Sequence, residues 1–206
     1  MIRPDGSEGA SIPLGTEGTV GRSSTHEALA GDPFLSPEHA TFSATGSGYR
    51  VRDCDSHNGV FLRIGTEVDL QDGDQVRLGQ ELLVFRTMSA LEPITPPSKD
   101  DTMTYGSPDG GSWGRLVLVN APDQETRSFL LRDDSVTVGR EIGDILFRDD
   151  GFVSGKHARF EKLEERVLLK DLGSSNGTYL RIRGEQELKH GDLVLMGQQL
   201  FRLMCD

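Results

Sequence analysis

The chain has 206 residues, of which 35% are hydrophobic and 27% are charged, and its formal net charge is −11. This composition is typical of a folded globular protein and argues against wholesale disorder. No apolar run approaches the roughly 20 residues that a helix needs to cross a bilayer, and the first residues lack the apolar core of a secretory signal. We therefore expect a cytoplasmic protein without a membrane partner, in which Cys54 and Cys205 are free thiols.

The negative charge is unevenly distributed along the chain. The net charge is −6 in residues 1–86, −3 in residues 87–112 and −2 in residues 113–206. No segment has the basic surplus with which proteins displace counterions from duplex phosphates, so we expect no nucleic-acid partner. Recognition of a single phosphate group stays open, because it needs only one or two local cations.

An internal repeat runs through most of the chain. Seven pairs of motifs lie 118 residues apart: Gly21-Arg22 and Gly139-Arg140, Ser36 with His39 and Ser154 with His157, Asp53 and Asp171, Asn58-Gly59 and Asn176-Gly177, Arg63-Ile64 and Arg181-Ile182, Gly73-Asp74 and Gly191-Asp192, and Gly79-Gln80 and Gly197-Gln198. Because the offset is constant, neither copy has a net insertion over this stretch. The pattern indicates a duplicated domain, and its period is too long for a solenoid, so each copy should have its own core.

The repeat predicts two modules and a linker. The first module covers residues 1–86 and the second covers residues 113–206. Residues 87–112 are predicted as the linker, since residues 91–98 are rich in proline and residues 105–112 are rich in glycine and serine.

Short strands are predicted throughout the second copy. Apolar or alternating runs bounded by Gly, Asp, Asn and Pro occur at residues 116–119, 135–138, 157–160, 167–169 and 193–195. No window of 11 or more residues combines a 3.6-residue period with a cap at its start. Short strands spaced by about ten residues indicate an all-β sandwich or barrel.

The first copy lacks a counterpart of the expected first strand of the second copy. Residues 114–119, the expected first strand of the second copy, correspond by the offset to positions at or before Met1. Two interpretations stay open: the chain is a fragment of a longer protein, or the first module lacks an outer strand. A missing strand would expose a sheet edge to pairing with another chain.

Four motifs in a fixed order occur in both copies. In the second copy they are Gly139-Arg140, Ser154-Gly155-Lys156-His157, residues 171–178 and His190-Gly191-Asp192, and in the first Gly21-Arg22, Ser36-Pro37-Glu38-His39, Asp53 with Ser56-His57-Asn58-Gly59, and Asp72-Gly73-Asp74. In order and spacing they resemble the signature of forkhead-associated (FHA) domains of bacterial type. The resemblance covers nearly the whole chain apart from the linker. It implies two β-sandwiches of about eleven short strands each, whose loops at one end bind a phosphothreonine peptide.

The site that the resemblance implies in the second copy suits a dianionic phosphate. Arg140 carries a planar head with several donors and a permanent charge. Ser154 offers a hydroxyl donor, Gly155 allows close approach of the backbone, and Lys156 adds positive charge. The predicted site is completed by Ser175, which is expected to reach the phosphate, and Asn176, which is expected to bind the peptide backbone.

The candidate site of the first copy consists of Arg22, Ser36, His57 and Asn58. This copy has Pro37, which lacks an N–H group, in place of Gly155, and the negative Glu38 in place of Lys156. We therefore expect the C-terminal module to be the stronger reader. The first module is expected to be weaker, differently selective or purely an interaction surface.

Simpler interpretations apply to several of these residues. The resemblance implies that His39 and His157 support the binding loops by hydrogen bonds, and the two Asn-Gly pairs are also typical of hairpin turns. No His/Cys cluster has metal-ligand spacing, and no nucleophile is accompanied by a candidate base, so we expect no metal, no cofactor and no enzyme. The chief alternative function is a phospho-independent scaffold that uses the same fold.

Expectations about partners follow from the resemblance. It implies a signalling adaptor whose partner is a phosphothreonine-containing protein, namely a Ser/Thr kinase or a substrate of one. The resemblance also implies that loops between the later strands read the third residue after the phosphothreonine. Arg181 and Arg183, with Arg63 as the counterpart in the first copy, lie just beyond the Asn-Gly turns, which favours an acidic or polar residue there, solvated surface arginines being the simpler interpretation. Self-recognition through phosphorylated Thr95, Thr102 or Thr104 of the linker is a further hypothesis, an ordinary linker being the simpler interpretation.

Overall fold

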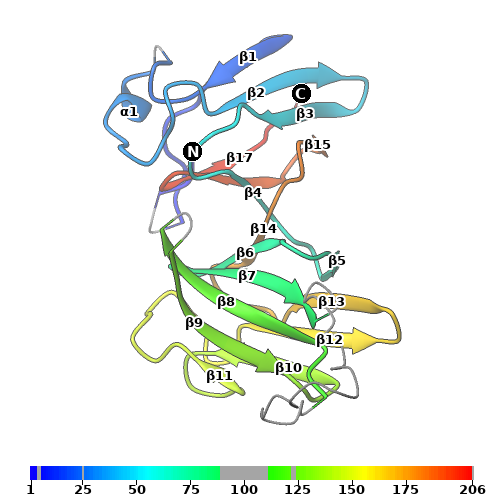
Figure 1. Ribbon diagram of the computed structural model, residues 1–206. Helices are drawn as coiled ribbons and strands as arrows, with labels where there is room; N and C mark the ends of the chain where they lie inside the picture. Colours follow the sequence, from blue (N-terminus) through cyan, green and yellow to red (C-terminus); the bar gives the residue numbers. More distant parts are fainter. Residues whose placement is uncertain (4–5, 25, 89–110, 122–123, 206) are drawn as a thin grey trace, which may run out of the picture. The chain divides into compact units, whose positions relative to one another are not determined.

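A computed structural model of the protein describes residues 1–3, 6–24, 26–88, 111–121 and 124–205 (Figure 1). Seventeen strands and one four-residue helix, α1 (Glu27–Ala30), lie in this part of the chain, which confirms the all-β prediction. All five stretches predicted as strands fall within strands of the structure, to within one residue at their ends. No helix among the described residues is long and apolar enough to span a membrane.

The chain forms two compact units, each built from parts of both copies of the repeat. Unit 1 consists of Met1–Ile64 and Tyr179–Asp206, and unit 2 consists of Gly65–Thr178. These units differ from the contiguous modules 1–86 and 113–206, because the strands at residues 67–70, 75–78 and 81–87 of the first copy lie in unit 2, and those at residues 185–188, 193–196 and 199–202 of the second copy lie in unit 1. The constant offset of 118 residues explains how this is accommodated: the exchanged segments have equal length and the same pattern, so either one fits in the place of the other.

Unit 1 is a sandwich of two sheets. One sheet has the antiparallel order β1 (Glu17–Val20), β2 (Ala40–Thr45), β3 (Gly48–Asp53) and β15 (Glu185–Leu188). The other has the order β17 (Gln199–Arg202), β16 (Leu193–Met196), β4 (Val60–Arg63) and β14 (Thr178–Arg181).

Unit 2 is also a sandwich. One sheet has the order β11 (Ile145–Leu146), β10 (Ser135–Gly139), β12 (Ala158–Leu163), β13 (Arg166–Asp171) and β5 (Glu67–Leu70), antiparallel except for the pair β10 and β11. The other has the order β6 (Gln75–Leu78), β7 (Glu81–Thr87), β8 (Gly114–Ala121) and β9 (Gln124–Leu131), all antiparallel.

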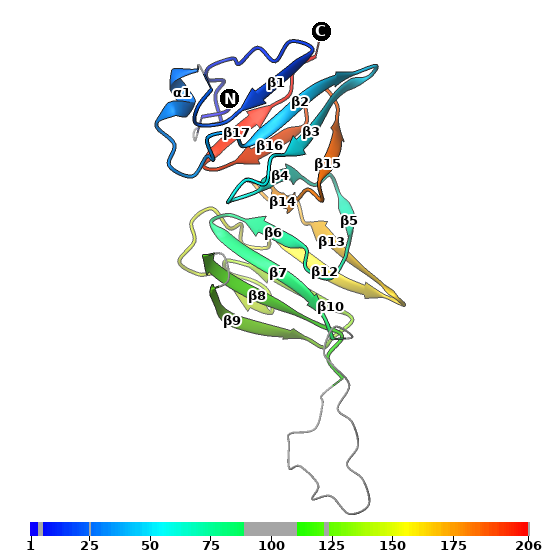
Figure 2. The same ribbon diagram turned by 45° about the horizontal axis from the view of Figure 1, so that its top comes forward.

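The two exchanged strands occupy equivalent positions in their sheets (Figure 2). In unit 1, β15 pairs with β3 so that Glu187 lies opposite Arg50, and the two side chains form an ion pair at 2.6 Å. In unit 2, β5 pairs with β13 so that Asp69 lies opposite Leu168, the residue 118 positions after Arg50. The two pairings therefore have the same register.

The core of each unit combines side chains from both copies. In unit 1 the buried cluster joins two groups, Val20, Leu29, Leu35, Ala40, Phe42, Val51 and Val60 from the first copy with Leu188, Val194, Met196 and Leu203 from the second. In unit 2, Leu70, Val76, Leu83 and Phe85 of the first copy are buried in the same way. Each buried Leu, Val or Phe contributes about 1.5–3 kcal/mol relative to exposure. The exchanged strands are thus part of the core.

The sandwiches differ at one edge. In unit 2, the hairpin of β8 and β9 covers the outer edge of β7. Its counterpart in unit 1, β17, carries on its outer edge a single bridge between Ile2 and Leu200, with an N···O distance of 2.7 Å, as far as the described residues show. The N-terminal residues thus cover only part of the edge that a two-stranded hairpin covers in unit 2.

Candidate functional site

Three loops of unit 2 meet at Ser154. The Arg140 N–H group, directly after β10, donates to the Ser154 carbonyl at 2.9 Å. The Ser175 N–H group donates to Ser154 Oγ at 3.0 Å. Lys156 is exposed in the same loop as Ser154, and the Gly155 carbonyl accepts N–H groups of the loop after β10. The structure therefore brings Arg140, Ser154 and Ser175 together, as the sequence predicts.

A buried histidine supports this arrangement. His157 Nδ1 accepts the Ser154 N–H group at 3.0 Å, and Nε2 lies 3.1 Å from the Gly177 carbonyl. Because Nδ1 is the acceptor, the ring proton of the neutral form is on Nε2 and is donated to Gly177. Burial lowers the pKa of His157, and this effect outweighs the opposing influence of the Gly177 carbonyl and of nearby carboxylates. His157 thus links the Ser154 loop to the Asn-Gly turn in its neutral form.

The lowered pKa of His157 predicts that acid weakens unit 2. The unfolded chain binds a proton at this side chain more readily than the folded chain does, so stability is complete above the ordinary histidine pKa of about 6.5 and falls as the pH drops through it. We expect the urea midpoint of unfolding to decrease from pH 7.5 to pH 5.5, and to decrease less in a His157→Gln variant. Equal slopes in the two proteins would contradict the prediction.

Asp171 holds the turn that carries Ser175 and Asn176. Its Oδ1 accepts the N–H groups of Gly173 and Ser174, both at 2.9 Å, and its Oδ2 accepts the hydroxyl groups of Ser174 at 2.6 Å and Thr178 at 2.7 Å. Burial raises the pKa of this carboxyl, but the hydrogen bonds outweigh burial and leave the pKa below its ordinary value. The carboxylate therefore fixes the turn in its charged form.

Two residues that the sequence reasoning missed also shape the site. The Asn176 side chain donates to the Phe152 carbonyl at 2.8 Å, and the buried Asp150 accepts the Phe152 N–H group at 2.8 Å. Asp150 Oδ2 also accepts the N–H group of Gln80, which belongs to the first copy, at 2.6 Å. The repeat contains the signal for both residues, because Asp32 and Phe34 precede them by 118 positions.

Arg140 has an acidic neighbour on the surface. Its guanidinium group forms an ion pair with Glu141 Oε1 at 2.8 Å. Both side chains are exposed to solvent, and such pairs contribute little to stability. An arriving anion can therefore take the place of Glu141 at low cost.

The loops of unit 1 repeat this geometry. Arg22 donates its N–H group to the Ser36 carbonyl at 2.9 Å, and the His57 N–H group donates to Ser36 Oγ at 3.1 Å. Asn58 donates to the Phe34 carbonyl at 2.8 Å. His39 is buried and stands between the Ser36 N–H group, at 3.0 Å, and the Gly59 carbonyl, at 2.9 Å. The predicted residues of the first copy thus lie together as well, and the two histidines occupy equivalent positions.

The second copy supplies a cation beneath the unit 1 loops. Arg181 lies 3.6 Å from Asp53, the counterpart of Asp171. A Cβ atom at Gly59, whose φ is 79°, would collide with the Arg181 side chain, so only glycine fits this position. The structure groups Arg181 with unit 1, beside Asp53, and its role in reading the peptide stays a prediction. The linker threonines lie outside the described residues.

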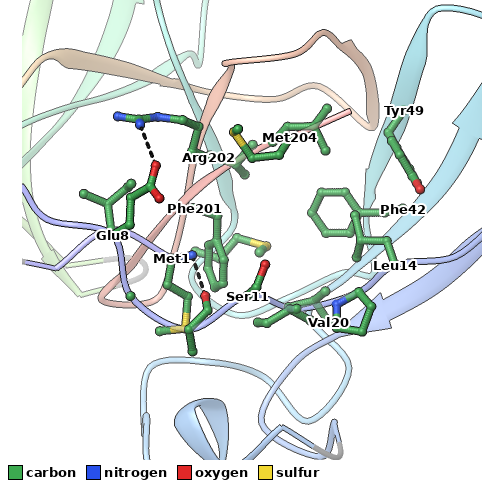
Figure 3. A pocket seen from close by; sticks show the side chains of 18 residues that line it. Met1, Glu8, Ser11, Leu14, Val20, Phe42, Tyr49, Phe201, Arg202 and Met204 are labelled. Atoms are coloured by element: carbon green, nitrogen blue, oxygen red, sulfur yellow. Dashed lines mark hydrogen bonds and ion pairs between the residues drawn. The ribbon is translucent and has the colours of Figure 1, made fainter. Parts of the chain in front are cut away.

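A cavity of about 360 Å³ lies in unit 1, away from these loops. Figure 3 shows Phe42 on one side and, on another, the ion pair between Glu8 and Arg202 at 3.6 Å. None of the predicted binding residues lines it. It lies beside β17, whose outer edge has no β8–β9 hairpin, and so follows from the different edges of the two sandwiches. Within the described part of the chain, no cluster of three or more His, Cys, Asp or Glu residues is placed to hold a metal ion.

Each of the two β-sandwiches brings together an arginine, a serine and an Asn-Gly turn, and a buried histidine links the serine loop to the turn. This arrangement is typical of domains that bind their ligands through loops at one end of a sandwich. The chain belongs to the FHA domain family, whose model matches residues 18–79 and residues 136–197. Each matched segment is contiguous in sequence and contains one of the two points at which the chain passes from one unit to the other.

The chain is similar to bacterial regulatory proteins. It is 37% identical over 100 residues to an oxoglutarate dehydrogenase inhibitor of Corynebacterium diphtheriae, a match covering 48% of this chain and 67% of that protein. It is 34% identical over 125 residues to the protein of the same name in Corynebacterium glutamicum, covering 59% and 84%. It is 31% identical over 141 residues to the glycogen accumulation regulator GarA of Mycobacterium tuberculosis, covering 65% and 83%.

Proposed function

We propose that this protein is a non-enzymatic adaptor that binds phosphothreonine peptides in Ser/Thr-kinase signalling, with unit 2 as the stronger reader. The observation that carries the proposal is the convergence of Arg140, Ser154 and Ser175 on rigid loops, with Lys156 exposed beside them. A cation that cannot lose its charge and hydroxyl donors on fixed loops are what a phosphate dianion requires.

Each side chain has a role in this proposal. The Arg140 guanidinium group pairs with phosphate oxygens and releases Glu141. The hydroxyl groups of Ser154 and Ser175 donate to the phosphate, and Ser154 keeps its hydroxyl proton for this purpose because its oxygen accepts the Ser175 N–H group. Asn176, held against Phe152, binds the peptide backbone.

Local charge supports the ranking of the two sites. Among the loop residues beside the serine, Arg140 and Lys156 against Glu141 give a net charge of +1 in unit 2, whereas Arg22 and Glu38 cancel in unit 1, since Ser23 stands in place of Glu141. This count leaves out Asp171 and the Asp53–Arg181 pair, which hold the Asn-Gly turns. In addition, Pro37 lacks the N–H group that Gly155 has. One charge-assisted hydrogen bond is worth about 1.5–3 kcal/mol, so we propose a difference of at least about tenfold in affinity.

The names of the relatives suggest a broader role. They are an inhibitor of an enzyme and a regulator of glycogen accumulation. We propose that this protein likewise acts in the cytoplasm by binding a phosphothreonine-containing protein, either a Ser/Thr kinase or a substrate of one. Capture of phosphorylated Thr95, Thr102 or Thr104 by a site of the same chain belongs to the same proposal.

Titration of the full chain with a phosphothreonine peptide library tests the proposed function. We expect binding to some phosphorylated peptides and none to the same sequences with unmodified threonine, because the site is built around a dianion. Isothermal titration calorimetry gives the affinity and the number of sites. If no phosphorylated peptide binds, or if unmodified peptides bind equally well, the proposed function is wrong.

A scaffold that works without phosphate is the second candidate. The outer edge of β17, which has only the Ile2 bridge among the described residues, favours it for unit 1, because unpaired strand edges bind extended chains. Phosphatase treatment of a captured partner separates the two functions, since a scaffold keeps its partner and a phosphothreonine reader releases it.

A further inference from the structure

An exposed phenylalanine lies at the same place in the binding loops of each unit. The side chain of Phe152 is 49% exposed in unit 2, and that of Phe34 is 46% exposed in unit 1. The next residues, Val153 and Leu35, are almost fully buried and anchor the loops in the core. The phenylalanine rings are therefore not needed to pack these loops.

Two hydrogen bonds hold the backbone of Phe152 in place. Its N–H group donates to Asp150 and its carbonyl accepts Asn176, both at 2.8 Å. The ring therefore leaves the backbone at the residue that Asn176 grips. A peptide that Asn176 binds passes within reach of the ring.

Comparison of the two copies favours a binding role for the ring. Several positions of the loops differ between the copies, among them Gly155 against Pro37, Lys156 against Glu38, and Ser175 against His57. The phenylalanine is retained although it is exposed. Of six exposed large hydrophobic residues among those the structure describes, three lie in the binding loops: Phe34, Phe152 and Ile142.

Ile142 adds apolar surface to unit 2 alone. Its side chain is 57% exposed, and its N–H group donates to the Gly155 carbonyl at 2.9 Å, which places it beside the Ser154 loop. Its counterpart in unit 1 is Ser24. The loops of unit 2 thus carry two exposed apolar side chains where those of unit 1 carry one.

We propose that Phe152, assisted by Ile142, contacts an apolar side chain next to the phosphothreonine, so that unit 2 selects phosphopeptides with Leu, Ile, Val, Met or Phe at that place. An aromatic ring and an aliphatic side chain gain by covering apolar surface, whereas a charged peptide side chain would lose hydration there without a partner. This inference rests on the proposed function. It is an alternative to the acidic or polar residue that Arg181 and Arg183 favour, which stays a prediction.

Paired phosphopeptides test the inference on the full chain. The peptides are identical except for Leu or Ser at one of the positions near the phosphothreonine, and an Arg22→Ala background silences unit 1. We expect the Leu peptide to bind about fivefold more tightly at one position or more, as burial of a few tens of Å² of apolar surface predicts. In Phe152→Ser this ratio falls to about one, and in Ile142→Ser it falls part of the way.

A matched control comes from the far end of β12. Leu163 is 48% exposed, and Leu163→Ser should keep the fivefold ratio. Urea unfolding shows that each variant is folded. The inference is overturned if the Arg22→Ala parent shows no preference for the Leu peptide, or if Phe152→Ser shows the same preference as its parent. The proposed function survives either outcome as long as binding of the phosphopeptide still depends on Arg140. If no phosphopeptide binds, the proposed function and the inference fail together.

Discussion

Arg140→Ala should reduce the affinity of the full chain for a phosphothreonine peptide by at least about tenfold without unfolding unit 2. The guanidinium group is a permanent cation on the residue whose backbone bonds to Ser154, and loss of a charge-assisted pair costs about 1.5–3 kcal/mol. Arg140 is on the surface, and its backbone N–H group keeps its bond to Ser154 in the variant. Fluorescence anisotropy with a labelled peptide measures the affinity, and the urea midpoint reports the fold.

Two matched variants show whether this loss comes from phosphate recognition. Glu141→Ala also breaks the Arg140 ion pair, yet it should leave binding equal or tighter, because a carboxylate that competes for Arg140 has been removed. Arg22→Ala removes the equivalent cation of unit 1 and should have the smaller effect. If Arg22→Ala weakens binding as much as Arg140→Ala, the ranking of the two units is wrong.

A cysteine pair at Glu67 and Lys170 should form a disulfide within one chain nearly completely under mild oxidation. These residues lie opposite each other in β5 and β13, and their side chains form an ion pair at 3.5 Å. Neighbouring residues of antiparallel strands have Cα separations that suit a disulfide. The variant carries Cys54→Ser and Cys205→Ser to remove the native thiols. By closing a loop of about 100 residues, the bond should also stabilise the protein by about 4 kcal/mol.

The control pair is Arg52 and Glu67. These two residues would face each other if β5 paired with β3 of its own copy, just as Glu185 pairs with Arg52 in the structure. We expect this pair to stay reduced. Mass spectrometry of the monomer distinguishes the two results, and oxidation of the control pair in place of the first would show that the strands are not exchanged.

The motifs predicted most of the geometry of each candidate site, because short-range patterns determine it. Arg140, Ser154, Ser175 and the Asn-Gly turn come from one copy and are held by bonds within that copy. The turns and strands could be predicted for the same reason, because alternating apolar runs and Gly, Asp and Asn residues set the local backbone geometry.

The exchange of strands could not be predicted from the same patterns. β5 and β15 are equal in length and lie 118 residues apart, so hydrophobic pattern and register fit either partner equally well. The position of Arg181 beside Asp53 depends on this choice. Asp150 and Phe152 were overlooked although the repeat contains both, because their roles depend on Asn176 and Gln80, which are distant in sequence.

The exchange changes what a cut in the chain would do. Between Thr87 at the end of β7 and Gly114 at the start of β8, the chain connects two strands of the same unit. A protease that cleaved there would not release two separate domains, because each unit would still hold strands from both fragments. The Asp150 carboxylate would still accept the Gln80 N–H group, and Asp32 that of Gln198. The nicked protein would therefore be a split pair, in which neither fragment can complete the core of a unit without the other.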